Sequence, residues 1–256
     1  MGIQEQGLTK QQVRQYHERG WLGPFTLISA SEMAIVRDTI DEEILEPGMA
    51  QGLHEKEYFH NRHLDNLCVY ELLSHPNLVE KAASILGPHL VLWRTNFQIK
   101  QPLSQQDDWD TEIPWHQDCA YYQPSPNVIL SAWIAVDETS KSNGCMQVLS
   151  GSHKRLYPHI TTPGAERFGK AADPTTFDPD EAVDIELKAG EFIFFNESTL
   201  HYSPPNKSET RRFGITPRLT VPFVEIGNRA KIEVLMLRGE DYMGDYNVVE
   251  PPSSAA

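Results

Sequence analysis

The feature of this sequence that most constrains its fold is a change of pattern at Pro88. Before this residue, apolar side chains recur at the spacing of amphipathic helices, and after it short apolar runs are separated by glycine, proline and asparagine. Because the helices come first and do not alternate with the strands, a doubly wound α/β fold is not expected. The pattern predicts a mainly β fold with flanking helices, a sandwich or barrel behind an N-terminal helical segment.

Helix start and stop signals predict three helices in the first third of the chain. Thr9 and Gln12 have the spacing of a capping box, in which two side chains satisfy free amides at the start of a helix. The proline–glycine breakers at 46–48 and 87–88 are expected to stop the second and third helices. The expected spans are 9–20, 29–46 or 31–46, and 76–86.

The expected strands lie in the rest of the chain, where apolar runs are rich in valine, isoleucine, phenylalanine and tryptophan. The run 128–136 is almost continuously apolar, as in a strand that is buried on both faces. The other expected strands are 89–100, 145–149, 183–187, 192–195 and 211–219.

The 256 residues are expected to form a single domain, 1–256. Its expected parts are a mostly helical support at 1–88, a strand-rich core at 89–222 and a C-terminal extension at 223–256. Within the core, the polar stretch 158–182 is rich in proline and glycine. Connections of this length often serve as active-site lids, so the stretch is interpreted as a lid, with a disordered surface insertion as the alternative.

Charge and composition exclude several classes of protein. The formal net charge is −14, and an acidic chain repels phosphate backbones, so nucleic-acid binding is not expected. No apolar run approaches the length of a membrane span, and the first residues lack the features of a signal peptide. The three cysteines lie far apart, which suits a reducing compartment. We expect a cytoplasmic protein with no membrane partner, and these features leave the oligomeric state open.

The pattern His-x-Asp occurs twice, so a single occurrence is weak evidence for a metal site. His60 and His63 lie in a mixed segment and are interpreted as surface histidines, with a zinc-binding helix face as the alternative. His116 instead opens the strand-rich part of the chain. Residues i and i+2 of a strand point to the same side, which predicts that His116 and Asp118 project together.

A third ligand must come from elsewhere in the chain, and His201 is the best candidate. It follows the strand expected at 192–195 and so lies at the end of a sheet element. Two imidazoles and one carboxylate on a common face form the ligand set of non-haem Fe(II) oxygenases. The residues alone leave two alternatives, a zinc hydrolase with the same ligands and histidines with a structural role.

Three motifs surround these candidates. They are Trp115-His116-Gln117-Asp118, the run SNGCMQVLSGSHK at 142–154, and His201-Tyr202-Ser203-Pro204-Pro205-Asn206 with Arg211-Arg212 after it. Together they resemble the phytanoyl-CoA dioxygenase family of Fe(II)/2-oxoglutarate oxygenases. The motifs stand in the family's order and cover about residues 90–220, and the helical N-terminus is similar, though less specifically.

The resemblance implies a double-stranded β-helix, a cupin-like jelly roll of two sheets, at 89–222. It also implies that His116, Asp118 and His201 bind Fe(II), with 2-oxoglutarate and O2 as co-substrates. In this family the far carboxylate of 2-oxoglutarate pairs with an arginine eleven residues after the second histidine, which here is Arg212. A planar, always-charged guanidinium suits this role because it binds a carboxylate through two hydrogen bonds.

Arg211 and Arg218 compete with Arg212 for this role. Arg212 and Arg218 share one strand face, so parity does not choose between them, whereas the family spacing favours Arg212. Arg211 is interpreted as a solvated surface charge. The resemblance implies three further co-substrate contacts, Ser203, Asn96 and Ser131.

The function implied by the resemblance is the hydroxylation of a small molecule, with release of succinate and CO2. Related halogenases replace the acidic ligand by alanine or glycine, and because this chain keeps Asp118 we expect oxygen insertion. No basic cluster for a CoA phosphate is present, so a CoA thioester is not the expected substrate. By analogy with small members of the family, the resemblance implies a natural-product or amino-acid-like intermediate. The alternatives are desaturation, demethylation or ring formation at the same iron, and a non-catalytic jelly-roll binding protein with a relic metal site.

Overall fold

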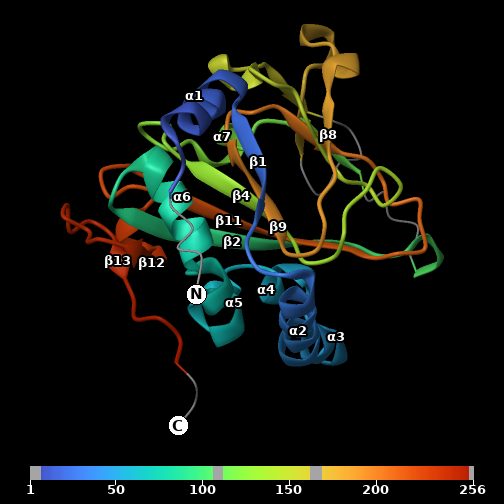
Figure 1. The fold of residues 1–256 in the computed structure, drawn as a ribbon, viewed down its shortest axis with the longest axis horizontal. Helices are drawn as coiled ribbons and strands as arrows, with labels where there is room; N and C mark the ends of the chain where they lie inside the picture. Colours follow the sequence, from blue (N-terminus) through green and yellow to red (C-terminus); the bar gives the residue numbers. More distant parts are fainter. Residues whose placement is uncertain (1–6, 106–111, 162–168, 254–256) are drawn as a thin grey trace.

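The computed structural model describes residues 7–105, 112–161 and 169–253, in which two β-sheets dominate (Figure 1). The strands are β1 (Trp21–Thr26), β2 (Leu90–Lys100), β3 (Ile113–His116), β4 (Leu130–Ala135), β5 (Met146–Val148), β6 (His159–Thr161), β7 (Lys170–Ala172), β8 (Val183–Ile185), β9 (Glu191–Asn196), β10 (His201–Ser203), β11 (Arg212–Thr220), β12 (Glu233–Arg238) and β13 (Asn247–Val248). The helices are α1 (Lys10–Arg19), α2 (Ala30–Ile40), α3 (Glu46–Ala50), α4 (Glu55–Tyr58), α5 (Leu67–Leu73), α6 (Pro76–Leu86) and α7 (Cys119–Tyr122), with a π-helix at Asp41–Leu45. Short 3-10 helices lie at Arg62–Leu64, Leu103–Gln105, Ser152–Lys154, Pro174–Thr176, Pro179–Glu181 and Arg229–Lys231. The mainly β fold with N-terminal helices is confirmed.

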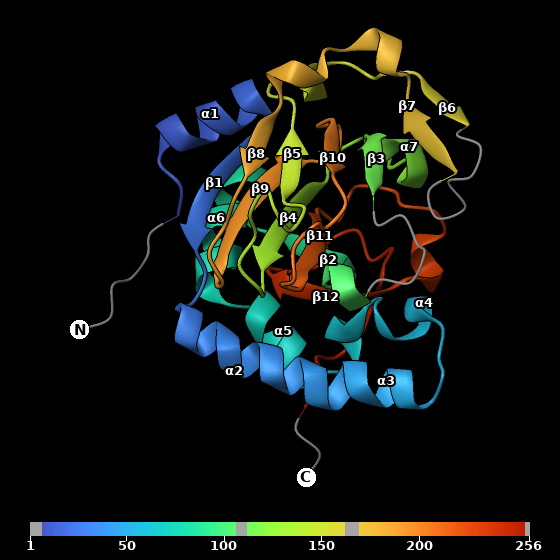
Figure 2. The same cartoon turned by 90° about the vertical axis from the view of Figure 1, so that its right-hand side faces the viewer.

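The two large sheets face each other as a double-stranded β-helix (Figure 2). The strand order is β1-β9-β4-β11-β2-β12-β13 in the seven-stranded sheet and β3-β10-β5-β8 in the four-stranded sheet. Side chains of both sheets form one buried cluster, which includes Trp133 of β4, Val148 of β5 and Phe195 of β9. The space between the two sheets is therefore part of the buried core.

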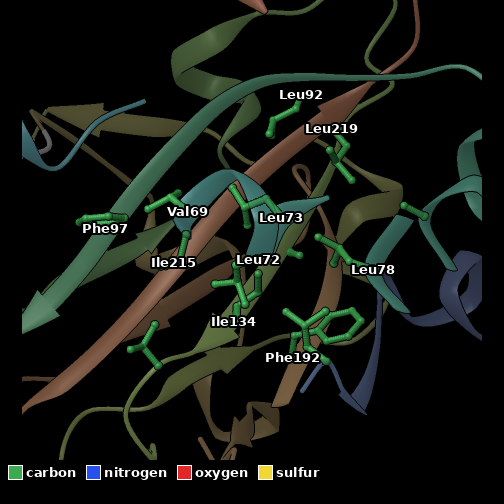
Figure 3. Packing of buried hydrophobic residues seen from close by; sticks show 14 of the residues in the cluster. Val69, Leu72, Leu73, Leu78, Leu92, Phe97, Ile134, Phe192, Ile215 and Leu219 are labelled. Carbon is green, nitrogen blue, oxygen red and sulfur yellow. The ribbon is translucent and has the colours of Figure 1, made fainter. Parts of the chain in front are cut away.

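The N-terminal helices pack on the outer face of the seven-stranded sheet. Leu73 of α5 and Leu78 of α6 belong to the same buried cluster as Ile134 of β4 and Ile215 of β11 (Figure 3). Burying one such side chain stabilises a fold by about 1.5–3 kcal/mol, so this cluster holds the helices in place and leaves the inner face of the sheet to the site. Among the described residues, no helix is long and apolar enough to cross a membrane.

The predicted start and end of the first helix are confirmed. Thr9 Oγ1 accepts a hydrogen bond from the Gln12 amide at 3.3 Å, and Gln12 Oε1 accepts one from the Thr9 amide at 2.9 Å. The helix ends at Gly20, whose φ of 81° is left-handed and favours glycine. Of the two candidates for the second N-cap, the chain uses Ser29.

The predicted end of the second helix at 46–48 is wrong. The chain continues from α2 through the π-helix into α3, which ends only at Ala50. The Glu46 amide donates to Asp41 O, five residues back, so the hydrogen-bond ladder shifts just before Pro47. Pro47 thus lies in the first turn of α3, directly after the shift in the ladder, where the fixed φ of proline fits the helix.

The apolar pattern does not predict the strands β1, β12 and β13. β1 pairs with β9, and β12 pairs with β2, which brings part of 223–256 into the main sheet. These strands are stabilised by partners far away in the sequence, so a local pattern does not reveal them. The stretch 158–182 contains the β6–β7 hairpin, and its residues 162–168 lie outside the described part of the chain.

The prediction that His63 lies at the surface is wrong. Its side chain is fully buried, and Nδ1 lies 2.8 Å from Thr95 Oγ1 of β2. The segment around it runs along the edge of β2, where the Asn61 amide donates to Thr95 O at 2.9 Å. Burial lowers the pKa of His63 to about 4, so this histidine is a neutral part of the core.

Candidate active site

His116 and His201 are cross-strand neighbours at the inner face of the four-stranded sheet. His116 is the last residue of β3 and His201 the first of β10, and the two are paired in register. Their ring centroids lie 4.1 Å apart, and the ring centroid of His201 lies 5.1 Å from that of Phe195. Both histidines are buried. Strand pairing therefore brings together two imidazoles that are far apart in the sequence, as predicted.

Asp118 reaches the same place by a different local geometry from the one expected. β3 ends at His116, and Asp118 is the N-cap of α7 with helical backbone angles, so strand parity does not apply to it. The turn nevertheless returns its carboxylate to the imidazole, with Oδ1 3.5 Å from His116 Nε2. Ligand atoms of His116, Asp118 and His201 all lie within 4.8 Å of one another. The predicted three side chains thus form one cluster.

Both histidines are held with the same nitrogen facing the cluster. His116 Nδ1 lies 2.8 Å from Pro114 O, and His201 Nδ1 lies 2.9 Å from Thr199 O. A carbonyl oxygen only accepts hydrogen bonds, so each Nδ1 carries the proton. Each Nε2 then presents a lone pair, which is the arrangement of metal-binding imidazoles.

The charges at the cluster suit a divalent cation. Burial raises the pKa of Asp118, but the Arg218 guanidinium and the two imidazoles outweigh it and hold this pKa well below its usual range. Burial and the nearby His116 lower the pKa of His201 to about 3. One carboxylate and neutral imidazole nitrogen therefore meet in a buried site, the donor set that fits Fe(II).

Arg218 of β11 orients Asp118. Its Nη2 donates to Asp118 Oδ2 at 2.9 Å, and both side chains are buried. Engaging Oδ2 leaves Oδ1 on the side of the histidines, so the ion pair selects which oxygen faces the cluster.

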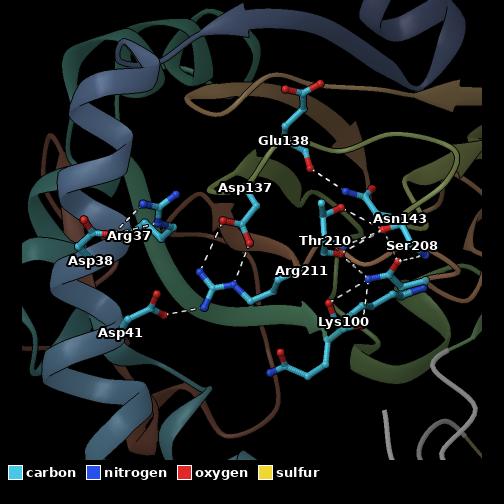
Figure 4. A network of polar contacts seen from close by, with 12 residues as sticks. Arg37, Asp38, Asp41, Lys100, Asp137, Glu138, Asn143, Ser208, Thr210 and Arg211 are labelled. Atoms are coloured by element: carbon cyan, nitrogen blue, oxygen red, sulfur yellow. Dashed lines mark hydrogen bonds and ion pairs between the residues drawn. The ribbon is translucent and has the colours of Figure 1, made fainter. Parts of the chain in front are cut away.

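Arg211, expected to be a solvated surface charge, is partly buried and paired instead. Its Nη1 lies 2.8 Å from Asp41 Oδ1 and its Nε lies 2.9 Å from Asp137 Oδ2, so it ties the π-helix to the end of β4 (Figure 4). Arg211 and Arg218 therefore both contact carboxylates of the chain.

Arg212 lies deep between the sheets. Its Nη1 donates to Ser203 Oγ at 3.3 Å, and its guanidinium carbon lies 5.4 Å from the Trp133 ring centroid. Gly214 leaves room for that ring, because a Cβ there would lie 2.2 Å from Trp133 Cζ2. Sequence reasoning missed Lys100, whose Nζ donates to Ser203 Oγ at 2.6 Å. The only sequence signal for Lys100 was a charge at the end of an apolar strand.

The structure places Asn96 and Ser131 beside Arg218 rather than beside Arg212. Asn96 Oδ1 accepts from Arg218 Nη1 and from Arg94 Nε, each at 3.0 Å. Ser131 is paired in register with Arg218 across β4 and β11. Its buried hydroxyl has no hydrogen-bond partner among the described residues.

Glu197 is a buried acid that sequence reasoning missed. It follows β9 directly, is fully buried, and neither carboxyl oxygen has a hydrogen-bond partner within the described residues. Burial and the negative charge of Asp118 raise the pKa of Glu197 to about 8, although Arg218 lowers it in part. The sequence signal for it was an acidic residue at the end of the apolar run 192–195.

Comparisons with known proteins agree with this geometry. The family model "Phytanoyl-CoA dioxygenase (PhyH)" matches residues 16–214. A probable alpha-ketoglutarate-dependent hypophosphite dioxygenase of Stutzerimonas stutzeri is 27% identical over 251 residues, which cover 90% of this chain and 86% of that protein. The apo structure of the non-heme monooxygenase ThoJ has a TM-score of 0.81 at 25% identity and covers 94% of this chain and 88% of its own. CytC3 with Fe(II) and alpha-ketoglutarate has a TM-score of 0.70 at 21% identity, with coverages of 95% and 93%.

Proposed function

Because the chain belongs to the phytanoyl-CoA dioxygenase family, whose members are non-haem Fe(II)/2-oxoglutarate dioxygenases, we propose that it hydroxylates a small molecule with release of succinate and CO2. The observation that carries the proposal is the convergence of His116, Asp118 and His201, in which both histidines turn Nε2 toward the carboxylate. These three side chains would hold Fe(II) through two nitrogens and one oxygen.

The far carboxylate of 2-oxoglutarate is assigned to Arg212. Arg211 and Arg218 are each occupied by carboxylates of the chain, whereas Arg212 contacts the Ser203 hydroxyl and the Trp133 ring. Ser203 lies two residues after the metal-binding His201 and would share the co-substrate with Arg212. Lys100 adds a second cation at the same hydroxyl, which favours an anionic guest there.

The chain's own groups prepare the site for its reaction. Bound iron and 2-oxoglutarate supply the activation of O2 that oxidises a substrate C–H bond. Arg218 holds Asp118 in the orientation that the iron requires, and Asn96 holds Arg218 in turn. Phe195 and the surrounding core exclude water from the side of His201. Ser131 and Asn96 lie on the Asp118 side, where we assign them to the co-substrate's metal-facing end.

A small substrate agrees with the name of one relative. The Stutzerimonas stutzeri relative is named for hypophosphite, a small molecule. Because this chain keeps Asp118 as a ligand, we propose oxygen insertion as the outcome, on a natural-product or amino-acid-like intermediate. Desaturation, demethylation and ring formation use the same ligands and differ only in the substrate's geometry.

The test is a co-substrate assay with a matched inactive variant. Purified protein is incubated with Fe(II), 2-oxoglutarate, ascorbate and a panel of amino acids and natural-product intermediates, and succinate and oxygenated products are followed by mass spectrometry. We expect substrate-dependent succinate formation that is lost in His116→Ala. Equal succinate formation by His116→Ala would contradict the proposal, and activity that requires Zn²⁺ in place of Fe(II) would favour the hydrolase.

A further inference from the structure

A cavity opens where the outer edge of β2 changes partner. β12 pairs with this edge at residues 90–92, and the segment 59–61 bonds to it at 95–97. Between the two lies a gap at Trp93 and Arg94. A cavity of about 370 Å³ fills this gap, with Asn61, Lys231 and Glu233 among its other walls.

Trp93, one of the residues that line the cavity, carries a buried donor that does not reach the cavity. Trp93 is only 4% exposed, and its Nε1 has no hydrogen-bond partner among the described residues. An indole N–H donates and never accepts, and buried donors in native proteins are almost always paired. Because this nitrogen has almost no accessible surface, a molecule in the cavity does not reach it, and Trp93 contributes to the wall only by its bulk.

The charged groups around the cavity favour a negatively charged ligand. Arg94 and Lys231 contribute two positive charges against one negative charge from Glu233, in a chain whose net charge is −14. The Arg94 guanidinium is held in place, because its Nε donates to Asn96 Oδ1 at 3.0 Å and its carbon lies 5.2 Å from the Tyr122 ring centroid. A fixed guanidinium is a preorganised binder of carboxylate or phosphate oxygens.

The cavity wall is connected to the metal-binding residue Asp118 by side-chain hydrogen bonds. Asn96 Oδ1 accepts from Arg94 Nε and from Arg218 Nη1, and Arg218 Nη2 donates to Asp118 Oδ2. The Tyr122 ring contacts both guanidiniums, at 5.2 and 5.0 Å. Movement of Arg94 on binding a guest would therefore act on the residue that orients a metal ligand.

We propose that this cavity binds the anionic group, carboxylate or phosphate, of a small molecule. Arg94 and Lys231 donate to its oxygens. Binding is coupled to the metal-binding residues His116, Asp118 and His201 through Arg94, Asn96 and Arg218. The site is separate from the 2-oxoglutarate contacts assigned to Arg212, and it requires neither iron nor turnover.

The binding test uses the full chain without metal. Inorganic phosphate, propionate and the neutral propionamide are titrated by calorimetry, and we expect saturable binding of phosphate or propionate and none of propionamide. Whichever anion binds identifies the group. Arg94→Gln and Lys231→Gln should each raise its Kd about tenfold, as expected for losing a charged hydrogen bond. Trp93→Phe removes only the inaccessible N–H and should leave Kd within about twofold.

The matched control is Lys188→Gln, which removes one positive charge from an exposed residue outside the cavity and should leave Kd within about twofold. Lys231 is itself exposed, so its variant keeps the test valid if Arg94→Gln fails to fold. The absence of saturable anion binding would overturn the proposal. Binding that survives Arg94→Gln and Lys231→Gln but is lost in Arg212→Gln would overturn it too, because the anion would then lie between the sheets.

The coupling is tested by repeating the anion titration with Co(II) bound to His116, Asp118 and His201. Linkage requires that the metal change the anion's Kd by the same factor as the anion changes the metal's Kd. We expect a change of about fivefold or more that disappears in Asn96→Ala, while the anion still binds. Identical anion affinities with and without Co(II) would refute the coupling.

Discussion

The two ends of β11 carry the same residue type on the same strand face in different surroundings. Arg218 is paired with Asp118 and shares Asn96 with Arg94, so its charge is neutralised by the chain and serves to position a metal ligand. Arg212 lies against Ser203 and Trp133, with Lys100 at the same serine. Six residues along one strand thus separate an arginine that pairs with a carboxylate of the chain from one that we assign to a co-substrate.

Arg218→Gln is the substitution in β11 from which we expect the largest effect. Removing one member of a buried ion pair leaves Asp118 buried without its partner, and we expect a loss of about 3–5 kcal/mol in the free energy of unfolding. Metal affinity should also fall about 10- to 100-fold, because the orienting contact is gone. Urea unfolding of the metal-free protein and a Co(II) titration measure the two effects. A metal affinity equal to that of the wild type would show that Arg218 does not orient Asp118.

Arg212→Gln should affect the co-substrate instead of the metal. We expect the KM for 2-oxoglutarate to rise about 100-fold, equivalent to about 2.7 kcal/mol, with Co(II) affinity unchanged. The control is Arg211→Gln, which loses partly exposed ion pairs, about 1 kcal/mol of stability and none of the co-substrate affinity. If Arg211→Gln weakens 2-oxoglutarate more than Arg212→Gln does, the assignment is wrong.

Glu197, at the Arg218 end, makes that end sensitive to pH. Its pKa is raised to about 8 from an ordinary 4.5, so the folded protein keeps a proton that the unfolded chain loses as the pH rises. Stability from this group is complete below pH 4.5 and falls by about 2 kcal/mol between pH 5 and 7. Glu197→Gln should remove that fall. Measuring unfolding of both proteins at pH 5, 6 and 7 isolates the effect, and parallel pH curves would disprove it.

Ser203→Ala should give the smallest effect and refine the description of the Arg212 end. Losing one hydroxyl that contacts Arg212 and Lys100 is expected to raise the KM for 2-oxoglutarate about threefold to tenfold, with kcat unchanged. Steady-state kinetics with varied 2-oxoglutarate measures this. A fall in kcat at constant KM would place Ser203 in the reaction itself rather than in co-substrate binding.

Local signals in the sequence were sufficient for much of the fold. The capping box at Thr9 and the end of the first helix at Gly20 involve residues that contact one another within one helix, and both are found as predicted. β2, β4, β9 and β11 lie at predicted positions, because their apolar runs are long enough to require burial. β1 escaped prediction since its stability comes from pairing with β9, about 170 residues away.

The sequence by itself determined the three metal-binding candidates, because chemistry limits which residue types bind Fe(II) and the motif spacing singles out His116, Asp118 and His201. Tertiary structure decided which arginines pair with carboxylates of the chain, which oxygen of Asp118 faces the histidines, and that Glu197 is buried near Asp118 and Arg218. Burial and the identity of a charged partner depend on segments that meet only after folding. Desolvation and Coulomb energies act through space, so the same arginine has a different role at each end of one strand.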